Sequence, residues 1–193
     1  METTEDLEID EVTVERRTAS DVGVEESRDA WAEQARVALL EVASRYNAVL
    51  TYKELGGIVQ KESGIHTSQL LHNWIGDVLG RVAVDGVKRN EPMLASLCVD
   101  SNGSVGKPYL VAMAAIGEEI VGDADDHAAK ERLRCYEAFG ADLPSGGGSP
   151  TLTPRLSAAR TRERKARAAD KPANVCPNCN MAVPATGVCD NCG

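Results

Sequence analysis

Apolar residues recur at helical spacing through most of the first half of the chain. Over residues 29–46 they form one stripe, and this periodicity predicts a helix. The segment Thr51-Tyr52-Lys53-Glu54 has the sequence of a capping box and predicts a short helix that runs to about Gln60. Residues 68–82 carry a broad apolar face and predict a third helix, and residues 84–90 are expected to form a turn region.

The pattern changes in the second half. Residues 92–100 are mostly apolar and strand-like, and residues 101–104 are a strong turn signal. Residues 105–107 are expected to return as a short second strand. Residues 108–116 predict a helix with proline at its first position and glycine past its end, with a strand as the alternative. Acidic residues then cap a last predicted helix over residues 126–139.

Three helices followed by a strand, a turn and a strand have the order of a winged helix-turn-helix domain. The sequence therefore predicts an α+β fold, mainly helical, with this domain over residues 29–141. The third helix would be the recognition helix that enters the major groove of DNA, and residues 101–104 would form the wing.

Three segments of this domain carry a family resemblance. They are Thr51-Tyr52-Lys53-Glu54-Leu55, Ile75-Gly76-Asp77-Val78-Leu79 and Gly103-Ser104-Val105-Gly106. Over roughly residues 48–110, the chain resembles the DNA-binding domain of the alkylguanine-DNA alkyltransferases and alkyltransferase-like proteins. The resemblance implies that the threonine-tyrosine pair opens the helix-turn-helix and that Tyr52 matches the tyrosine that helps to rotate a target nucleotide out of the duplex.

The chain differs from this family at the positions of the family's functional residues. Asn73 stands at the position of the inserted arginine, Ala95 at the reactive cysteine and Ser96 at the histidine that follows it. Cys98 lies in an apolar stretch, whereas a reactive thiol needs an electropositive, partly exposed setting. The resemblance therefore implies the scaffold without alkyl transfer, and we expect no enzymatic activity and no catalytic residue.

The C-terminal residues contain two Cys-x-x-Cys pairs. Their spacing is that of a structural, four-cysteine zinc site, and the residues that it predicts as ligands are Cys176, Cys179, Cys189 and Cys192. All four positions are filled by cysteine, which indicates a closed structural site. Residues 173–193 resemble a zinc ribbon with rubredoxin-type knuckles, a family that binds nucleic acid or protein. A reducing cytosol suits all six cysteines, so a cytoplasmic location is expected.

Charge is distributed unevenly along the chain. The net charge is −9, and residues 1–34 alone hold twelve acidic and three basic residues. We expect residues 1–28 to be an acidic disordered tail. Residues 142–172 hold seven basic and three acidic residues and are predicted to be a flexible basic linker, partly helical. This linker is interpreted either as an arm that contacts phosphates or as a solvated spacer helix.

These features together favour a non-enzymatic, nucleic-acid-binding accessory or regulatory protein. The alternative is a protein–protein interaction adaptor that binds no DNA, such as a regulator from a phage or a defence system. DNA is the expected partner, with neither a membrane nor a small-molecule substrate. The candidate nucleic-acid contacts are Tyr52, Lys53, His72, Asn73, Lys107, Arg155, Arg160, Arg162, Arg164, Lys165 and Arg167.

Overall fold

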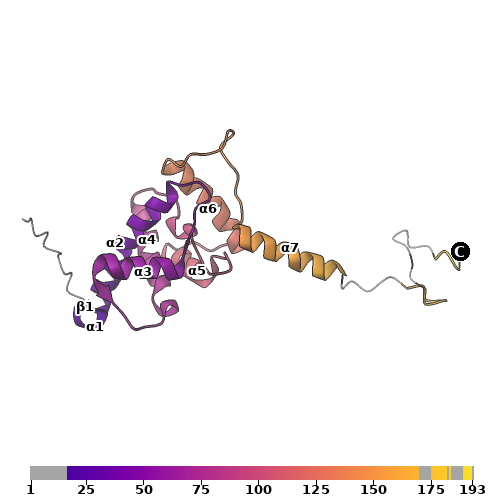
Figure 1. The fold of residues 1–193 in the computed structure, drawn as a ribbon, viewed down its shortest axis with the longest axis horizontal. Helices are drawn as coiled ribbons and strands as arrows, with labels where there is room; N and C mark the ends of the chain where they lie inside the picture. Colours follow the sequence, from indigo (N-terminus) through magenta and orange to yellow (C-terminus); the bar gives the residue numbers. More distant parts are fainter. Residues whose placement is uncertain (1–16, 170–174, 182, 184–188, 193) are drawn as a thin grey trace, which may run out of the picture. The chain divides into compact units, whose positions relative to one another are not determined.

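The computed structural model describes residues 17–169, 175–181, 183 and 189–192. The chain divides into two compact units, Met1–Thr153 and Pro154–Gly193. Helices dominate the described residues (Figure 1), which confirms a mainly helical fold. The elements are β1 (Arg17–Thr18), α1 (Ala19–Val22), α2 (Val24–Ala43), β2 (Leu50–Thr51), α3 (Tyr52–Ser63), β3 (Ile65–His66), the 3₁₀ turn η1 (Leu71–Asn73), α4 (Ile75–Lys88), the 3₁₀ turn η2 (Leu94–Leu97), β4 (Cys98–Val99), α5 (Gly106–Ala115), α6 (Ala124–Ala138) and α7 (Pro154–Ala169).

Helix α4 is the central helix of the first unit. Helices α2 and α5 both pack against it. The approach of α5 depends on two glycines, because a Cβ atom added at Gly76 would lie 3.3 Å from the Cβ of Val111, and one added at Gly80 would lie 3.2 Å from the Cβ of Ala115. The residues of α4 that are buried are Ile75, Gly76, Val78, Leu79, Gly80, Val82, Ala83 and Gly86.

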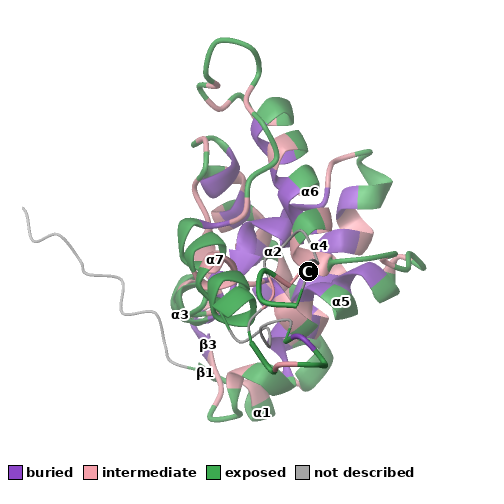
Figure 2. Cartoon of the chain, turned by 90° about the vertical axis from the view of Figure 1, so that its right-hand side faces the viewer, coloured by how far each residue is buried: buried purple, intermediate pink, exposed green. Residues whose placement is uncertain are grey.

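Two tryptophans form the centre of the core. The ring centroids of Trp31, in α2, and Trp74, just before α4, lie 4.6 Å apart. The Trp31 indole also donates a hydrogen bond of 3.0 Å to the carbonyl of Ile65. Aromatic pairs at this separation add to the energy of simple burial. Figure 2 shows the buried residues gathered between the helices of this unit, with exposed residues on their outer sides.

Local capping explains where several helices begin. Thr51 and Glu54 form the predicted capping box at the start of α3, since each side chain accepts from the backbone N–H of the other residue. The Asp123 carboxylate caps α6 by accepting from the N–H groups of Asp125 and Asp126, each at 3.0 Å. The predicted helix at residues 108–116 is confirmed as α5, and Gly117 follows it with a φ of 76°.

The predicted hairpin is wrong. Residues 94–97 form the turn η2, and residues 106 and 107, predicted as part of the second strand, already lie in α5. The short strand β4 pairs instead with β2 in parallel, with Leu50 opposite Cys98. The turn at residues 101–104 does form, but the Asp100 carboxylate organises it by accepting from the N–H groups of Asn102 and Ser104. The winged helix is therefore not confirmed.

The third helix also differs from its prediction. It begins at Ile75 because Leu70 is extended and residues 71–73 form a 3₁₀ turn, in which Asn73 N–H donates to the carbonyl of Leu70. It continues to Lys88, through the residues predicted as a turn, because its last turn is stabilised by an ion pair of 2.8 Å between Asp85 and Arg89. Eight of its fourteen residues are buried, and the side that is partly exposed carries the carboxylates of Asp77 and Asp85.

Part of the predicted acidic tail is ordered. Residues 1–16 lie outside the described residues, but Arg17–Thr18 pair in parallel with Ile65–His66. Helix α2 begins at Val24, five residues before the predicted start. Ion pairs explain the longer helix: Arg81 of α4 contacts Glu25 at 2.6 Å and Asp29 at 2.5 Å. Glu25, which was predicted to lie in the tail, therefore lies in a helix and pairs with Arg81 of the folded unit.

The start of the predicted flexible linker is folded onto the first unit. We call residues 142–153 the strap. Its Ser149 N–H donates to the Tyr46 hydroxyl at 3.3 Å, and the Thr153 hydroxyl donates to the carbonyl of Gly103 at 2.8 Å. Leu143 packs against the core. The glycine- and serine-rich composition that suggested flexibility instead supplies the turn residues of an ordered loop.

A buried arginine holds the strap in place. Arg132 of α6 is only 3% exposed, and its guanidinium donates to the carbonyls of Ser96 and Thr151 at 3.1 and 3.3 Å. Burial lowers the pKa of this arginine below its usual range. Arg132 therefore connects η2 to the strap through backbone carbonyls.

Candidate metal centre

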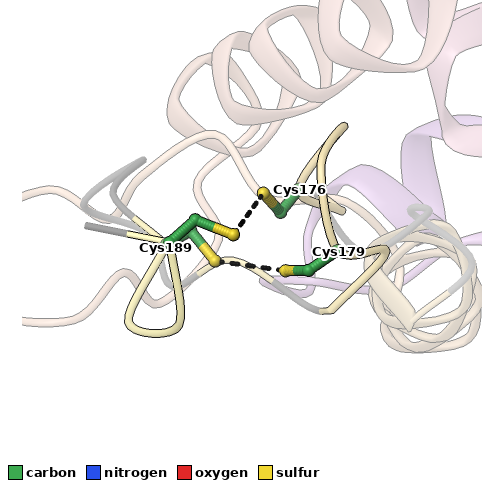
Figure 3. Close-up of side chains that lie close together, drawn as sticks. Cys176, Cys179 and Cys189 are labelled. Carbon is green, nitrogen blue, oxygen red and sulfur yellow. Dashed lines mark hydrogen bonds between the residues drawn. The ribbon is translucent and has the colours of Figure 1, made fainter.

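The first pair of cysteines lies in a tight turn of the second unit. The N–H of Asn180 donates to the carbonyl of Cys176, and the N–H of Cys176 donates to the carbonyl of Met181, both at 2.9 Å. Asn180 closes this turn with a φ of 56°, in the left-handed region that asparagine tolerates better than most residues. Together these bonds turn both sulfurs of the pair toward the same side (Figure 3).

The second pair brings its sulfurs to the first. The Sγ atoms of Cys176 and Cys192 lie 3.8 Å apart, and those of Cys179 and Cys189 lie 3.5 Å apart. All four sulfurs lie within 4.8 Å of one another. We call these four residues the cysteine cluster. Four sulfurs held at about 2.3 Å around one ion would be about 3.8 Å apart in a tetrahedron, so the observed distances fit a tetrahedral metal site.

The protonation of the cluster also suits a metal ion. Hydrogen bonds from the backbone N–H groups of Asn178 and Cys179 lower the pKa of the Cys176 thiol, and the N–H of Met181 lowers that of Cys179 to about 6. Contacts with the sulfurs of Cys179 and Cys176 raise the pKa of Cys192 to about 11. The fourth thiol is thus hard to ionise beside the others, and a cation among them would remove that cost.

The cluster contains thiols and not disulfides. A disulfide joins sulfurs at about 2.05 Å, and both short sulfur–sulfur distances here are far longer. The four predicted ligands are therefore positioned to hold a metal ion. Because all four donors come from the protein, an ion bound there would have no open position for a substrate.

The two remaining cysteines are not candidates for reactive thiols. Cys98 and Cys135 are buried in the core, and burial raises the pKa of both thiols. Ala95 and Ser96, which precede Cys98 in η2, are fully buried as well. This part of the first unit is packed interior.

Comparisons of the chain with protein-family models, with curated proteins and with solved structures gave no match. The function is therefore inferred from the chemistry of the described residues.

Tyr52, one of the predicted nucleic-acid contacts, is buried in the structure. Its side chain is buried, and its hydroxyl donates a hydrogen bond to the carbonyl of Val105. Burial raises the pKa of this hydroxyl well above its usual range. Tyr52 thus joins the start of α3 to the start of α5, and its side chain is not at the surface, where nucleic acid would be contacted. The sequence did not reveal this role because the partner carbonyl lies more than fifty residues away.

The other predicted contacts of the first unit are exposed. Lys53 lies in the first turn of α3, His72 and Asn73 lie in η1, and Lys107 lies in the first turn of α5. They come from three separate elements. No helix of the described chain presents several of them together, so they do not form the continuous basic face that a recognition helix would have.

Arg81, in the middle of α4, is neutralised by its neighbours. Arg81 contacts three carboxylates, since Asp77 also accepts from it at 3.2 Å, and Asp77 in turn accepts from Arg28 at 2.8 Å. Burial acts to raise the pKa of Asp77, but the hydrogen bonds and charges of Arg28 and Arg81 outweigh it and lower that pKa. These cations are used within the fold.

The remaining six predicted contacts all lie in α7. This helix contains six Lys and Arg residues and a single acidic residue, Glu163, and none of its residues is buried. Good helix formers explain why it forms: alanine and arginine dominate, and Pro154 occupies the first position. Glu163 and Arg167 add an ion pair of 2.5 Å at the favourable i, i+4 spacing.

Proposed function

We propose that this chain is a nucleic-acid-binding accessory or regulatory protein whose second unit makes the nucleic-acid contacts. The observation that carries the proposal is the separation of charge between the two units. Met1–Thr153 contains fourteen Lys and Arg against twenty-seven Asp and Glu, a net charge of −13, whereas Pro154–Gly193 contains seven against three, a net charge of +4.

The second unit has the properties of a phosphate-binding module. Cations that contact phosphates release counterions, which gives affinity without reading sequence. Six cations in α7 would give a slope of about −5 in a plot of log affinity against log salt concentration. Such contacts alone give a dissociation constant of about 1–100 μM at physiological salt.

The cysteine cluster would hold a structural zinc ion. Four thiolate ligands in a tetrahedral arrangement favour zinc, and a short segment that cannot bury a core depends on the metal to fold. The expected result is one zinc ion per chain by native mass spectrometry. Replacing both Cys176 and Cys179 by serine should abolish that binding, while the cooperative unfolding of the first unit, monitored by tryptophan fluorescence, stays unchanged.

The proposal is tested by fluorescence anisotropy of a labelled DNA duplex with the zinc-loaded full chain. Replacing Arg155, Arg162 and Arg164 by glutamine should lower the affinity strongly and should reduce the salt slope by about 2.7. The matched control replaces Arg45, Lys61 and Lys130 of the first unit by glutamine and changes the net charge by the same amount. If both variants lose affinity equally, overall charge and not α7 is responsible, and the proposal is wrong.

One observation favours the second candidate function, a protein-interaction adaptor. The first unit is strongly acidic, and α5 exposes the apolar side chains Leu110 and Val111, which are 46% and 38% exposed. In this alternative the first unit would bind a partner protein. An absence of any salt-sensitive DNA binding by the zinc-loaded chain would favour it.

No helix in the described part of the chain is both long and apolar enough to cross a lipid bilayer.

A further inference from the structure

The cations of α7 are arranged in two stripes on opposite sides of the helix. At about 100° per residue, Arg155, Arg162 and Lys165 fall within about 80° of one another. Arg160, Arg164 and Arg167 fall within about 60° of one another, and the centres of the two groups are about 170° apart. We call these groups the first stripe and the second stripe.

The two surfaces between the stripes differ in character. One contains Ser157, Thr161 and Ala168, which are small and uncharged. The other contains Leu156 and the acidic Glu163. The helix therefore has a small, uncharged side, an opposite side that includes its only carboxylate, and cations along both flanks.

This arrangement matches the major groove of duplex DNA. A groove about 12 Å wide admits an α-helix of about 10–12 Å diameter, with the phosphates of one strand along each flank. A helix that merely lay on the outside of a duplex would use cations on one side only. The cation-bearing part of α7, from Arg155 to Arg167, is about 18 Å long at 1.5 Å per residue and would follow about five base pairs.

We propose that α7 is a major-groove helix for duplex DNA, in which the two stripes contact the phosphates of the two strands. This inference rests on the proposed nucleic-acid binding and specifies its geometry. Ser157, Thr161 and Ala168 would face the base edges. The hydroxyls of serine and threonine can form hydrogen bonds with base edges, and the methyl groups of alanine and threonine can contact the methyl group of thymine. Glu163 would point away from the DNA, and Arg167 would exchange its exposed ion pair with Glu163 for a phosphate, because an exposed ion pair contributes little free energy.

This geometry predicts weaker binding to duplex RNA and to single-stranded DNA than to duplex DNA. The major groove of A-form RNA is deep and too narrow for side chains to read. A single strand presents one line of phosphates, so only one stripe would be used at a time. The zinc-loaded full chain should therefore bind duplex DNA more tightly than duplex RNA or single-stranded DNA of the same length.

The deciding experiment moves cations without changing their number. A neutralised variant, Arg164→Ala with Arg167→Ala, removes two cations from the second stripe. A moved variant carries these changes together with Ala158→Arg and Ala169→Arg, and both positions lie within about 30° of the centre of the first stripe. Alanine and arginine are both good helix formers, and far-ultraviolet circular dichroism checks that α7 is retained.

For duplex DNA, the neutralised variant should bind about 50-fold more weakly at 0.1 M salt, since each lost contact removes about 0.9 from the salt slope. The moved variant should remain as weak, because its restored cations all lie on one flank. For single-stranded DNA, the moved variant should regain the affinity of the original chain.

The outcomes separate this inference from the proposed function. If the moved variant recovers duplex affinity, or if duplex RNA binds as tightly as duplex DNA, the helix does not enter the groove, but α7 still binds nucleic acid. If the original chain binds neither DNA nor RNA, the inference and the proposed function both fail.

Discussion

Substitution of Gly80 tests whether close contact between α4 and α5 determines the packing of the first unit. An alanine Cβ at this position would lie 3.2 Å from the Cβ of Ala115, which is closer than ordinary van der Waals contact. Overpacking of a well-packed interior costs about 1–3 kcal/mol. The same change from glycine to alanine in a helix interior contributes about 1 kcal/mol of favourable helix propensity. We therefore expect Gly80→Ala to be neutral or destabilising.

A matched substitution in α3 isolates the packing effect. A Cβ added at Gly57 meets nothing within 4 Å, so Gly57→Ala should raise the free energy of unfolding by up to about 1 kcal/mol. Gly80→Ala should then be about 1–3 kcal/mol less stable than Gly57→Ala. Urea unfolding monitored by tryptophan fluorescence measures both, because the two tryptophans of the chain lie in the core.

A second change provides a direct check of the cause. Ala115→Gly removes the methyl group that faces position 80, so the double variant moves the glycine from one helix to the other. The double variant should recover stability relative to the sum of the single changes, with a coupling energy of at least about 1 kcal/mol. If Gly80→Ala is as stable as Gly57→Ala, or if Ala115→Gly gives no recovery, the inference of tight helix contact is wrong.

Three further substitutions test other parts of the first unit. Asp77 has a lowered pKa in the folded protein, so its contribution to stability is present above its unfolded pKa of about 4 and is lost as the pH falls through the folded value; Asp77→Asn should make acid unfolding measurably less steep. Arg132→Met should free the strap, so that proteolysis near residues 146–148 becomes at least about fivefold faster, whereas an unchanged cleavage rate would show that this arginine does not hold it. Thr51→Ala should lower the free energy of unfolding by about 1 kcal/mol, and equal urea midpoints would contradict that role of the capping box.

Features determined by neighbouring residues were predictable from the sequence. The capping box at Thr51, the helix at residues 108–116 and the four ligand positions of the cysteine cluster depend on short spacings, and the structure has all of them. Helical periodicity also located α2, α3 and α6, although their ends were displaced by a few residues.

Features determined by distant residues were not predictable. The strap has the composition of a flexible linker, and its order comes from partners such as Tyr46, about a hundred positions away. The short strand at Cys98–Val99 was expected to pair with its neighbour in sequence and pairs with Leu50–Thr51 instead. Tyr52 was interpreted from its family resemblance as a surface contact, and only its three-dimensional neighbours show that it is buried. Local sequence contains none of these pairings.

The two parallel ladders have a consequence for the order of folding. Arg17 pairs with Ile65 and Leu50 with Cys98, so each two-residue ladder closes a loop of the same length. Closing such a loop costs conformational entropy, and the few hydrogen bonds of a two-residue ladder offset little of that cost. We expect the helices to associate first around the two tryptophans and both ladders to form late. Hydrogen exchange would then show the amides of the ladders opening at a lower free energy than those of α4.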